Sequence, residues 1–175
     1  MDALETLRQQ LPSEAKDLKL NLQSVLTGGS LDEETRWGVA LASALTTRQP
    51  ALIDAVRQDA SVSDEVRSDA EAAAALMGMN NVYYRFRHFV SEAGSPDYEL
   101  PARLRMNRMA RPNDKRSFEL FCLAASAITG CELCVTSHEK VVRAAGLTAE
   151  QIHDAVRIAA TLHGIAIALD SGGAS

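Results

Sequence analysis

The residues with the clearest chemical potential lie in GCELCVTSHE, Gly130 to Glu139. Cys131 and Cys134 are three positions apart, and His138 follows Cys134 by four. On a helix, residues three and four apart share a face, so we expect Cys134 to lie beside both Cys131 and His138. Unpaired amides and the positive dipole end at a helix start stabilise a thiolate, as would a protonated His138. The spacing therefore predicts a nucleophilic cysteine and a pair of thiols able to form a reversible disulfide.

Glu119 is the second candidate. In the segment FELFCLAASAITGC, Phe118 to Cys131, it is the only ionisable side chain apart from cysteine, and a carboxylate in such a segment needs a partner. A tight turn at Gly130 would bring Glu119 and His138 to similar heights on antiparallel helices that rise about 1.5 Å per residue. We expect the two to hydrogen-bond, so that the imidazole can move a proton to or from Cys134.

Other interpretations of these residues remain open. Cys131, Cys134, His138 and Glu119 could supply four zinc ligands, although the sequence holds no second CxxC motif or histidine pair, and the cysteines could also be inert packing. Cys122 is expected to be small core filler.

Two further stretches carry polar residues of uncertain role. His163, inside an apolar run, is expected to be a hydrogen-bonded core histidine rather than a catalyst. The stretch NNVYYRFR, Asn80 to Arg87, is dense in polar and aromatic side chains. It is expected to pack in the core, with a substrate entrance as the alternative.

Helices must position these residues, because alanine and leucine dominate while aromatic and β-branched residues are scarce. The sequence predicts an all-α fold. Capping patterns of the form S/T-x-x-E/Q at Ser30 to Glu33 and at Thr148 to Gln151 mark two helix starts, and Gly130 ends the helix that contains Glu119. The expected helices cover roughly 2–10, 13–26, 31–46, 50–59, 63–92, 97–109 in part, 114–129, 131–145 and 148–170.

The chain also shows an internal similarity. ASALT at 42–46 recurs as ASAIT at 125–129, and a second match relates 73–78 to 159–164. We predict a single domain over 1–175 with an internally duplicated helical unit, degenerate at about 31–92 and active at about 114–170. At the positions of Glu119, Cys131, Cys134 and His138 the first copy has Arg36, Arg48, Ala51 and Ala55.

Composition limits the possible partners and locations. The net charge is −5 with both signs interspersed, which argues against nucleic acid binding. The start MDALETLRQQ lacks the features of a signal peptide, and the apolar run Ile158 to Leu169 is shorter than the roughly 20 residues of a membrane span. We expect a soluble cytoplasmic protein with no membrane partner. In a reducing compartment, paired cysteines indicate catalysis or metal binding more than a structural disulfide.

Glu119, the motif GCELCVTSH, the two-unit helical plan and the upstream MNNVYYRF together closely resemble the AhpD family of alkyl hydroperoxide reductases, within the carboxymuconolactone decarboxylase-like superfamily. The resemblance extends over essentially the whole chain. It implies an AhpD-like helical subunit, usually a homotrimer, that acts as an antioxidant peroxidase on organic hydroperoxides, with hydrogen peroxide as a further candidate substrate. It implies no haem, flavin or metal cofactor.

The resemblance also implies roles for single residues. Cys134 would attack the peroxide and become a sulfenic acid, which Cys131 would resolve to a disulfide, with Glu119 and His138 as the proton relay. A dihydrolipoyl protein or a thioredoxin-like adaptor would be the reductant. The sequence departs from the family pattern at Leu133, where the best-known members carry a histidine. Two rivals therefore remain: a thiol-disulfide oxidoreductase with little peroxidase turnover, and a redox-sensing or zinc-binding interaction module.

Overall fold

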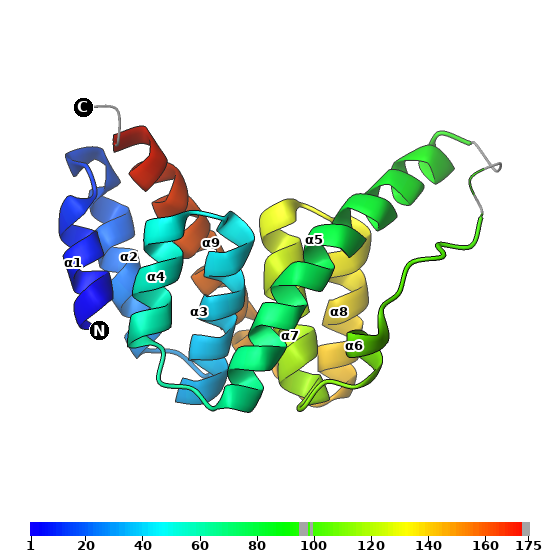
Figure 1. The fold of residues 1–175 in the computed structure, drawn as a ribbon, viewed down its shortest axis with the longest axis horizontal. Coiled ribbons are helices and arrows are strands. Elements are labelled where there is room, and N and C mark those ends of the chain that lie inside the picture. Colours follow the sequence, from blue (N-terminus) through cyan, green and yellow to red (C-terminus); the bar gives the residue numbers. More distant parts are fainter. Residues whose placement is uncertain (95–97, 99, 173–175) are drawn as a thin grey trace.

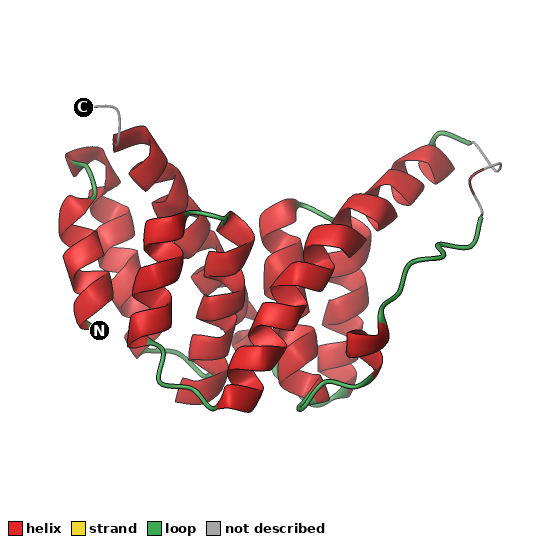
Figure 2. Ribbon diagram, viewed as in Figure 1, coloured by secondary structure: helices red, strands yellow, loops and turns green. Residues whose placement is uncertain are grey.

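The structure is a computed structural model that describes residues 1–94, 98 and 100–172. The regular elements within these residues are all helices (Figure 1). No strand occurs within these residues, as Figure 2 shows, and the all-α prediction is confirmed. The helices are α1 (Asp2–Gln10), the short 3-10 helix η1 (Ser13–Ala15), α2 (Lys16–Thr27), α3 (Glu33–Thr47), α4 (Pro50–Asp59), α5 (Asp64–Glu92), α6 (Asn107–Ala110), α7 (Lys115–Thr129), α8 (Glu132–Ala144) and α9 (Ala149–Gly172).

Most predicted helices form close to their predicted limits, and two differ. The segment 13–26 begins with η1, and the α-helix proper starts only at Lys16. Of the segment 97–109, residues 97 and 99 lie outside the described residues, and the only α-helix in the remainder is α6. The predicted break at Gly94-Ser95-Pro96 lies outside the described residues except for Gly94, which has a positive φ of 76° just beyond α5.

One of the two predicted capping boxes forms and the other does not. Before α9, the backbone N–H of Thr148 donates to Gln151 and the N–H of Gln151 donates to the Thr148 hydroxyl, which is the predicted reciprocal pair. Before α3, the cap is Asp32, which accepts from the Thr35 N–H at 2.8 Å. The prediction for Ser30 is wrong because its hydroxyl and N–H both donate to Asp154, at the far end of the sequence.

Helices α3 and α7 lie at the centre of the molecule. Helix α3 packs against α5, α7 and α9, while α7 also contacts α5, α8 and α9. Gly38 of α3 lies directly against the Phe121 ring of α7, where a Cβ atom would overlap the ring. The two central helices can therefore approach closely, and Figure 1 shows α8 on the outer side of α7, at the end of the molecule away from α1 and α2.

Helix α9 contains the apolar run noted in the sequence. By length and composition alone, Ala149–Ser171 could cross a membrane, but half of its apolar window is buried against the rest of the protein. The prediction for His163 is wrong, because His163 lies on the exposed side of α9 together with Ile167. Even where the sequence of a helix is apolar, the helix has two sides. Only one side of α9 packs against α2, α3 and α7, and His163 lies on the other.

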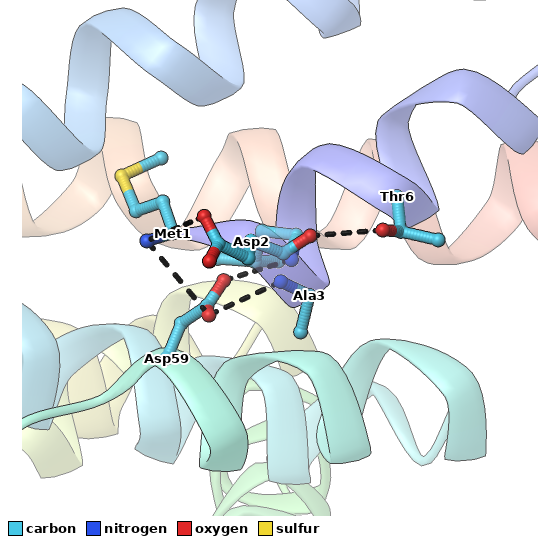
Figure 3. A network of polar contacts seen from close by, with 6 residues as sticks. Met1, Asp2, Ala3, Thr6 and Asp59 are labelled. Carbon is cyan, nitrogen blue, oxygen red and sulfur yellow. Dashed lines mark hydrogen bonds and ion pairs between the residues drawn. The ribbon is translucent and has the colours of Figure 1, made fainter.

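The N-terminus of helix α1 is capped by a residue that is distant in the sequence. Asp59, at the end of α4, accepts hydrogen bonds from the N–H groups of Ala3 and Leu4, and its carboxylate lies 3.9 Å from the amino group of Met1 (Figure 3). Helix α1 has no side-chain cap of its own, so Asp59 satisfies its free amides.

The two predicted repeats contain corresponding helices. Helices α3, α4 and α5 form most of the first, and α7, α8 and α9 form the second. The shared order agrees with an internal duplication, which stays a prediction, as does the single domain.

The C-terminal half of α5 extends away from the helical body, and the chain then returns to α6 (Figure 1). Large apolar side chains are exposed on this projection. We define the apolar arm as Phe86, Phe89, Tyr98, Leu100 and Leu104. The ring of Phe86 packs edge-on against Tyr98 at 5.4 Å between centroids, so the two sides of the arm touch.

Candidate active site

The two cysteines of the motif lie where α7 turns into α8. Gly130 has a positive φ of 69° and ends α7, and the N–H of Cys131 donates back to the Ser126 carbonyl. Cys131 is the N-cap of α8 and Cys134 lies in its first turn, where the free amides receive no side-chain cap. The two residues form a disulfide, with 5.3 Å between their Cα atoms. Once reduced, either thiolate would lie in the favourable field of the helix start.

Glu119 and His138 form a buried pair behind these cysteines. Oε2 of Glu119 lies 2.6 Å from Nδ1 of His138, and the two residues are only 6% and 7% exposed. Because Glu119 comes from α7 and His138 from α8, the antiparallel packing that the turn at Gly130 predicts brings them together. A carboxylate beside Nδ1 accepts a hydrogen bond from the N–H at that atom, which leaves Nε2 as the nitrogen that can exchange a proton with a reactant.

A cavity of about 280 Å³ opens beside Cys134 and His138. Its wall consists of residues from α5, α6, α8 and the segment before α6: Met77, Asn80, Tyr84, Met106, Met109, Leu133, Cys134, Ser137 and His138. Cys131 is fully buried and does not line it. A small molecule in this cavity would therefore meet the sulfur of Cys134 and the imidazole of His138, and the apolar wall would accept a hydrocarbon group.

Helix α5 contributes to the site in two ways. Asn81 hydrogen-bonds the side chains of Ser126 and Thr129, and Arg85 donates to the Thr129 carbonyl at 2.5 Å. These contacts hold the last turn of α7, and with it the start of α8. Asn80 and Tyr84, one position earlier in each case, line the cavity instead. For NNVYYRFR, the core prediction holds only for Asn80 and Asn81, because Val82 and Phe86 are exposed and the other residues are half-buried. The entrance alternative describes Asn80 and Tyr84, which line the cavity.

Leu133 is part of the walls of two neighbouring cavities. It lines the cavity beside Cys134 and also a neighbouring one of about 370 Å³, which includes Arg87, His88 and Tyr98. The side chain of Glu132 is exposed and lies 3.8 Å from His88. The position that carries a histidine in the best-known family members therefore presents an apolar surface to both cavities.

Cys122 is buried in α7, as predicted for core filler. Burial raises the pKa of its thiol well above the ordinary 9.0, and the nearby charges of Glu119 and Asp69 raise it further. This third thiol is therefore poorly suited to act as a nucleophile.

The zinc alternative needs two separate thiolates, whereas the two sulfur atoms here are joined. In the described ranges 1–94, 98 and 100–172, no cluster of three or more histidine, cysteine, aspartate or glutamate side chains could hold a metal ion.

The structure brings the four sequence-predicted site residues together as two linked pairs. Cys131 and Cys134 form the disulfide at the turn between α7 and α8, Glu119 and His138 pair between the two helices, and Cys134 and His138 line the same cavity. Reasoning from the sequence missed Met106 and Met109, which complete the cavity wall. Their segment was predicted to be helical in part, but that pattern does not say what the helix packs against, so only the folded chain brings them beside Cys134. The i, i+4 pair Asn80 and Tyr84 was detectable by its spacing, because two polar groups one turn apart share a face.

Comparisons with known proteins identify the family. Residues 98–172, which include α6 to α9, match the Carboxymuconolactone decarboxylase family. The chain is 56% identical to alkyl hydroperoxide reductase AhpD of Anaeromyxobacter sp. (strain Fw109-5), over 98% of the chain and 94% of that protein. It is 54% identical to the protein of the same name from Anaeromyxobacter dehalogenans (strain 2CP-C), over 99% and 94%. The corresponding protein of Gluconacetobacter diazotrophicus is 48% identical, over 98% and 95%.

Similarity at this level over almost the full length is not confined to the cysteine motif, since it includes the helices that position the motif. The resemblance inferred from the sequence is confirmed: the chain belongs to the AhpD family of alkyl hydroperoxide reductases.

Proposed function

We propose that this protein is an antioxidant enzyme that reduces organic hydroperoxides through a cycle of the Cys131–Cys134 dithiol and disulfide. The observation that carries the proposal is the shared cavity wall of Cys134 and His138, with Glu119 bonded to the other side of the imidazole. The names of the relatives support the same reaction class.

In the proposed first step, the Cys134 thiolate attacks the terminal oxygen of the hydroperoxide. The O–O bond breaks, an S–O bond forms, and the terminal OH group moves to sulfur as a sulfenic acid. The leaving alkoxide takes a proton from Nε2 of His138 and departs as an alcohol. Glu119 stabilises the imidazolium that precedes this transfer, because its carboxylate accepts the hydrogen bond at Nδ1.

In the second step, the sulfur of Cys131 attacks the sulfenic acid. The S–O bond breaks, water leaves after protonation, and the Cys131–Cys134 disulfide of the structure is the product. A dithiol donor of the dihydrolipoyl type, or a thioredoxin-like adaptor, then reduces the disulfide by thiol exchange. One hydroperoxide and two thiols thus become an alcohol, water and a disulfide, so the cysteines carry both electrons and the proposed cycle uses no haem, flavin or metal.

The proposal includes assembly and location. We propose a homotrimer in which the apolar arm of each subunit packs on another copy, since its exposed apolar side chains favour burial. The number three comes from the family resemblance. The dithiol cycle also requires a reducing compartment, which favours the cytoplasm.

A second candidate is a thiol-disulfide oxidoreductase that uses the same couple with little peroxide turnover. The observation that favours it is Leu133, which places a methyl-bearing side chain where a proton donor would assist peroxide cleavage.

The deciding experiment is a steady-state assay of dihydrolipoamide oxidation driven by cumene hydroperoxide, with hydrogen peroxide and other dithiols for comparison. Wild-type protein should turn over, and Cys134→Ser should lose the activity. Cys131→Ser should consume one equivalent of peroxide and retain a sulfenic acid that dimedone traps. Cys122→Ser is the matched control and should keep wild-type turnover, because that thiol is buried away from the cavity.

Rapid thiol exchange without peroxide turnover would favour the second candidate. One zinc ion per purified chain, with the cysteines as ligands, would contradict both and support an interaction module.

A further inference from the structure

Asn80 has an unused hydrogen-bonding group beside the proposed reaction centre. Its side chain lines the cavity that contains Cys134 and His138, and the residue is only 3% exposed. Nδ2 donates to the sulfur of Met109 at 3.2 Å, whereas Oδ1 is closed off from solvent and has no hydrogen-bond partner among the residues that the structure describes. A buried amide that binds only a thioether loses most of the hydrogen bonding it had in water.

The polar residues near Asn80 on α5 do not pair with its side-chain carbonyl. The neighbouring polar group on the same side of α5 is the Tyr84 hydroxyl, and within the described residues its hydrogen-bond partner is also a sulfur, that of Met106 at 4.0 Å. By contrast, Asn81, the next residue along the helix, has strong partners on both ends of its amide. An apolar residue of similar size would fill the place of Asn80 without the cost of an unpaired carbonyl.

We propose that Asn80 binds the hydroperoxide group directly, with Oδ1 accepting a hydrogen bond from the terminal O–H. This inference rests on the proposed function and adds a residue that contacts the substrate. The wall formed by Met77, Met106 and Met109 would receive the alkyl group. Oδ1 is closed off from solvent in this structure, so binding requires the amide to turn toward the cavity. Methionine side chains are flexible, and Met109 can yield its contact with the amide to permit this turn.

The chemistry of the first step suits a carbonyl at this place. The terminal OH group keeps its hydrogen when it moves from the hydroperoxide to sulfur, so no base is needed to remove it. A neutral acceptor can hold the O–H throughout and aim the terminal oxygen at Cys134. A carboxylate in the same place would also accept the hydrogen bond, but its negative charge would raise the pKa of the Cys134 thiol.

The test compares two reactions of the reduced protein. The first is the second-order rate of thiol loss with cumene hydroperoxide or hydrogen peroxide, and the second is the rate of Cys134 alkylation by iodoacetamide, which has no O–H group. Asn80→Leu should lower both peroxide rates about tenfold, as expected for one lost hydrogen bond, and leave alkylation unchanged. The control Gly78→Ala, on the same helix, adds a methyl group into open space and should change neither reaction.

A second variant is needed because Asn80→Leu could fail to fold. Asn80→Ser is smaller, its hydroxyl is too short to replace Oδ1, and it should show the same selective loss. Wild-type peroxide rates in a folded variant would overturn the inference while leaving the proposed function intact. An equal fall in peroxide and alkylation rates, or a fall for cumene hydroperoxide alone, would also overturn it, because these results mean altered thiol reactivity or altered cavity shape. If hydroperoxides do not oxidise wild-type protein at all, the proposed function fails and the inference with it.

Discussion

At the scale of single residues, the contact that matters most is the 2.6 Å hydrogen bond between Glu119 and His138. Both groups are buried, and a buried carboxylate is tolerated when a hydrogen-bond partner compensates the loss of water. The bond also fixes which imidazole nitrogen faces the cavity. In the proposed cycle this pair supplies the proton that the leaving alkoxide needs.

We expect Glu119→Gln to slow the oxidation of the reduced protein by hydroperoxide about 10²-fold at neutral pH. The amide keeps the size of the side chain but cannot stabilise an imidazolium as a carboxylate does, and positioned proton transfer contributes at least this factor. Stopped-flow measurement of thiol oxidation checks the prediction. A variant rate equal to that of the wild type would show that the pair is structural and not a proton relay.

At the scale of elements, α9 is held to the loop before α3 by one carboxylate. Oδ2 of Asp154 accepts from the N–H and hydroxyl of Ser30, each at 2.7 Å, and Oδ1 accepts from Arg157 at 2.8 Å. Burial by itself raises the pKa of Asp154, but the bonds from Ser30 and Arg157 outweigh it, so the net effect is a pKa below the ordinary 3.8. The folded protein therefore prefers the ionised form.

This preference makes a prediction about stability and pH. A carboxyl group with a lowered pKa in the folded state stabilises the fold above pH 3.8, and this contribution is lost as the pH falls through the lower folded value. Asp154→Asn should therefore reduce the free energy of unfolding by about 1 kcal/mol at pH 7, with a smaller difference below pH 3.8.

Urea unfolding of the two proteins at both pH values measures this difference. Asp54→Asn, the same change at an exposed position within α4, serves as the control and should have little effect. A difference between wild type and Asp154→Asn that stays constant with pH would contradict the charge argument.

At the scale of the whole molecule, the most unusual feature is the apolar arm that projects from the helical body (Figure 1). Phe89 is 62% exposed and Leu100 is 64% exposed, and neither belongs to the buried core of the described residues or packs against it. Exposed apolar side chains gathered on one projection are typical of a surface that another protein covers. A second copy of this chain is the partner that the proposed homotrimer supplies.

We expect Phe89→Glu to weaken this assembly, because burying the new charge in an apolar interface is costly. Light scattering after size exclusion should give the wild type a mass near three times 18.9 kDa and shift the variant toward 18.9 kDa. Ile167→Glu introduces the same charge on the exposed side of α9 and should leave the mass unchanged. A monomeric wild type, or an equal effect of both changes, would contradict the proposed role of the arm.

Much of the fold and of the candidate site could be predicted because it depends on neighbours in the sequence. The spacing of Cys131, Cys134 and His138 places them on one side of α8 as soon as a helix forms, and Gly130 allows the turn that brings Glu119 alongside. Alanine-rich and leucine-rich segments with caps such as Thr148 and Gln151 determine helices locally. The helical class, most helix limits and the residues expected to do chemistry therefore followed from the sequence by itself.

The tertiary structure decided whatever depends on partners far apart in the chain. Ser30 has the local pattern of a helix cap, but Asp154, 124 residues away, binds it instead. His163 lies in an apolar run, yet the packing of α9 leaves its side of the helix exposed. The cavity beside Cys134 is completed by Met106 and Met109, which line it together with residues of α5 and α8, and their local sequence does not encode this packing. Local patterns determine which helices form, whereas the sides that helices bury and the hollows between them depend on how those helices pack, which no short stretch of sequence encodes.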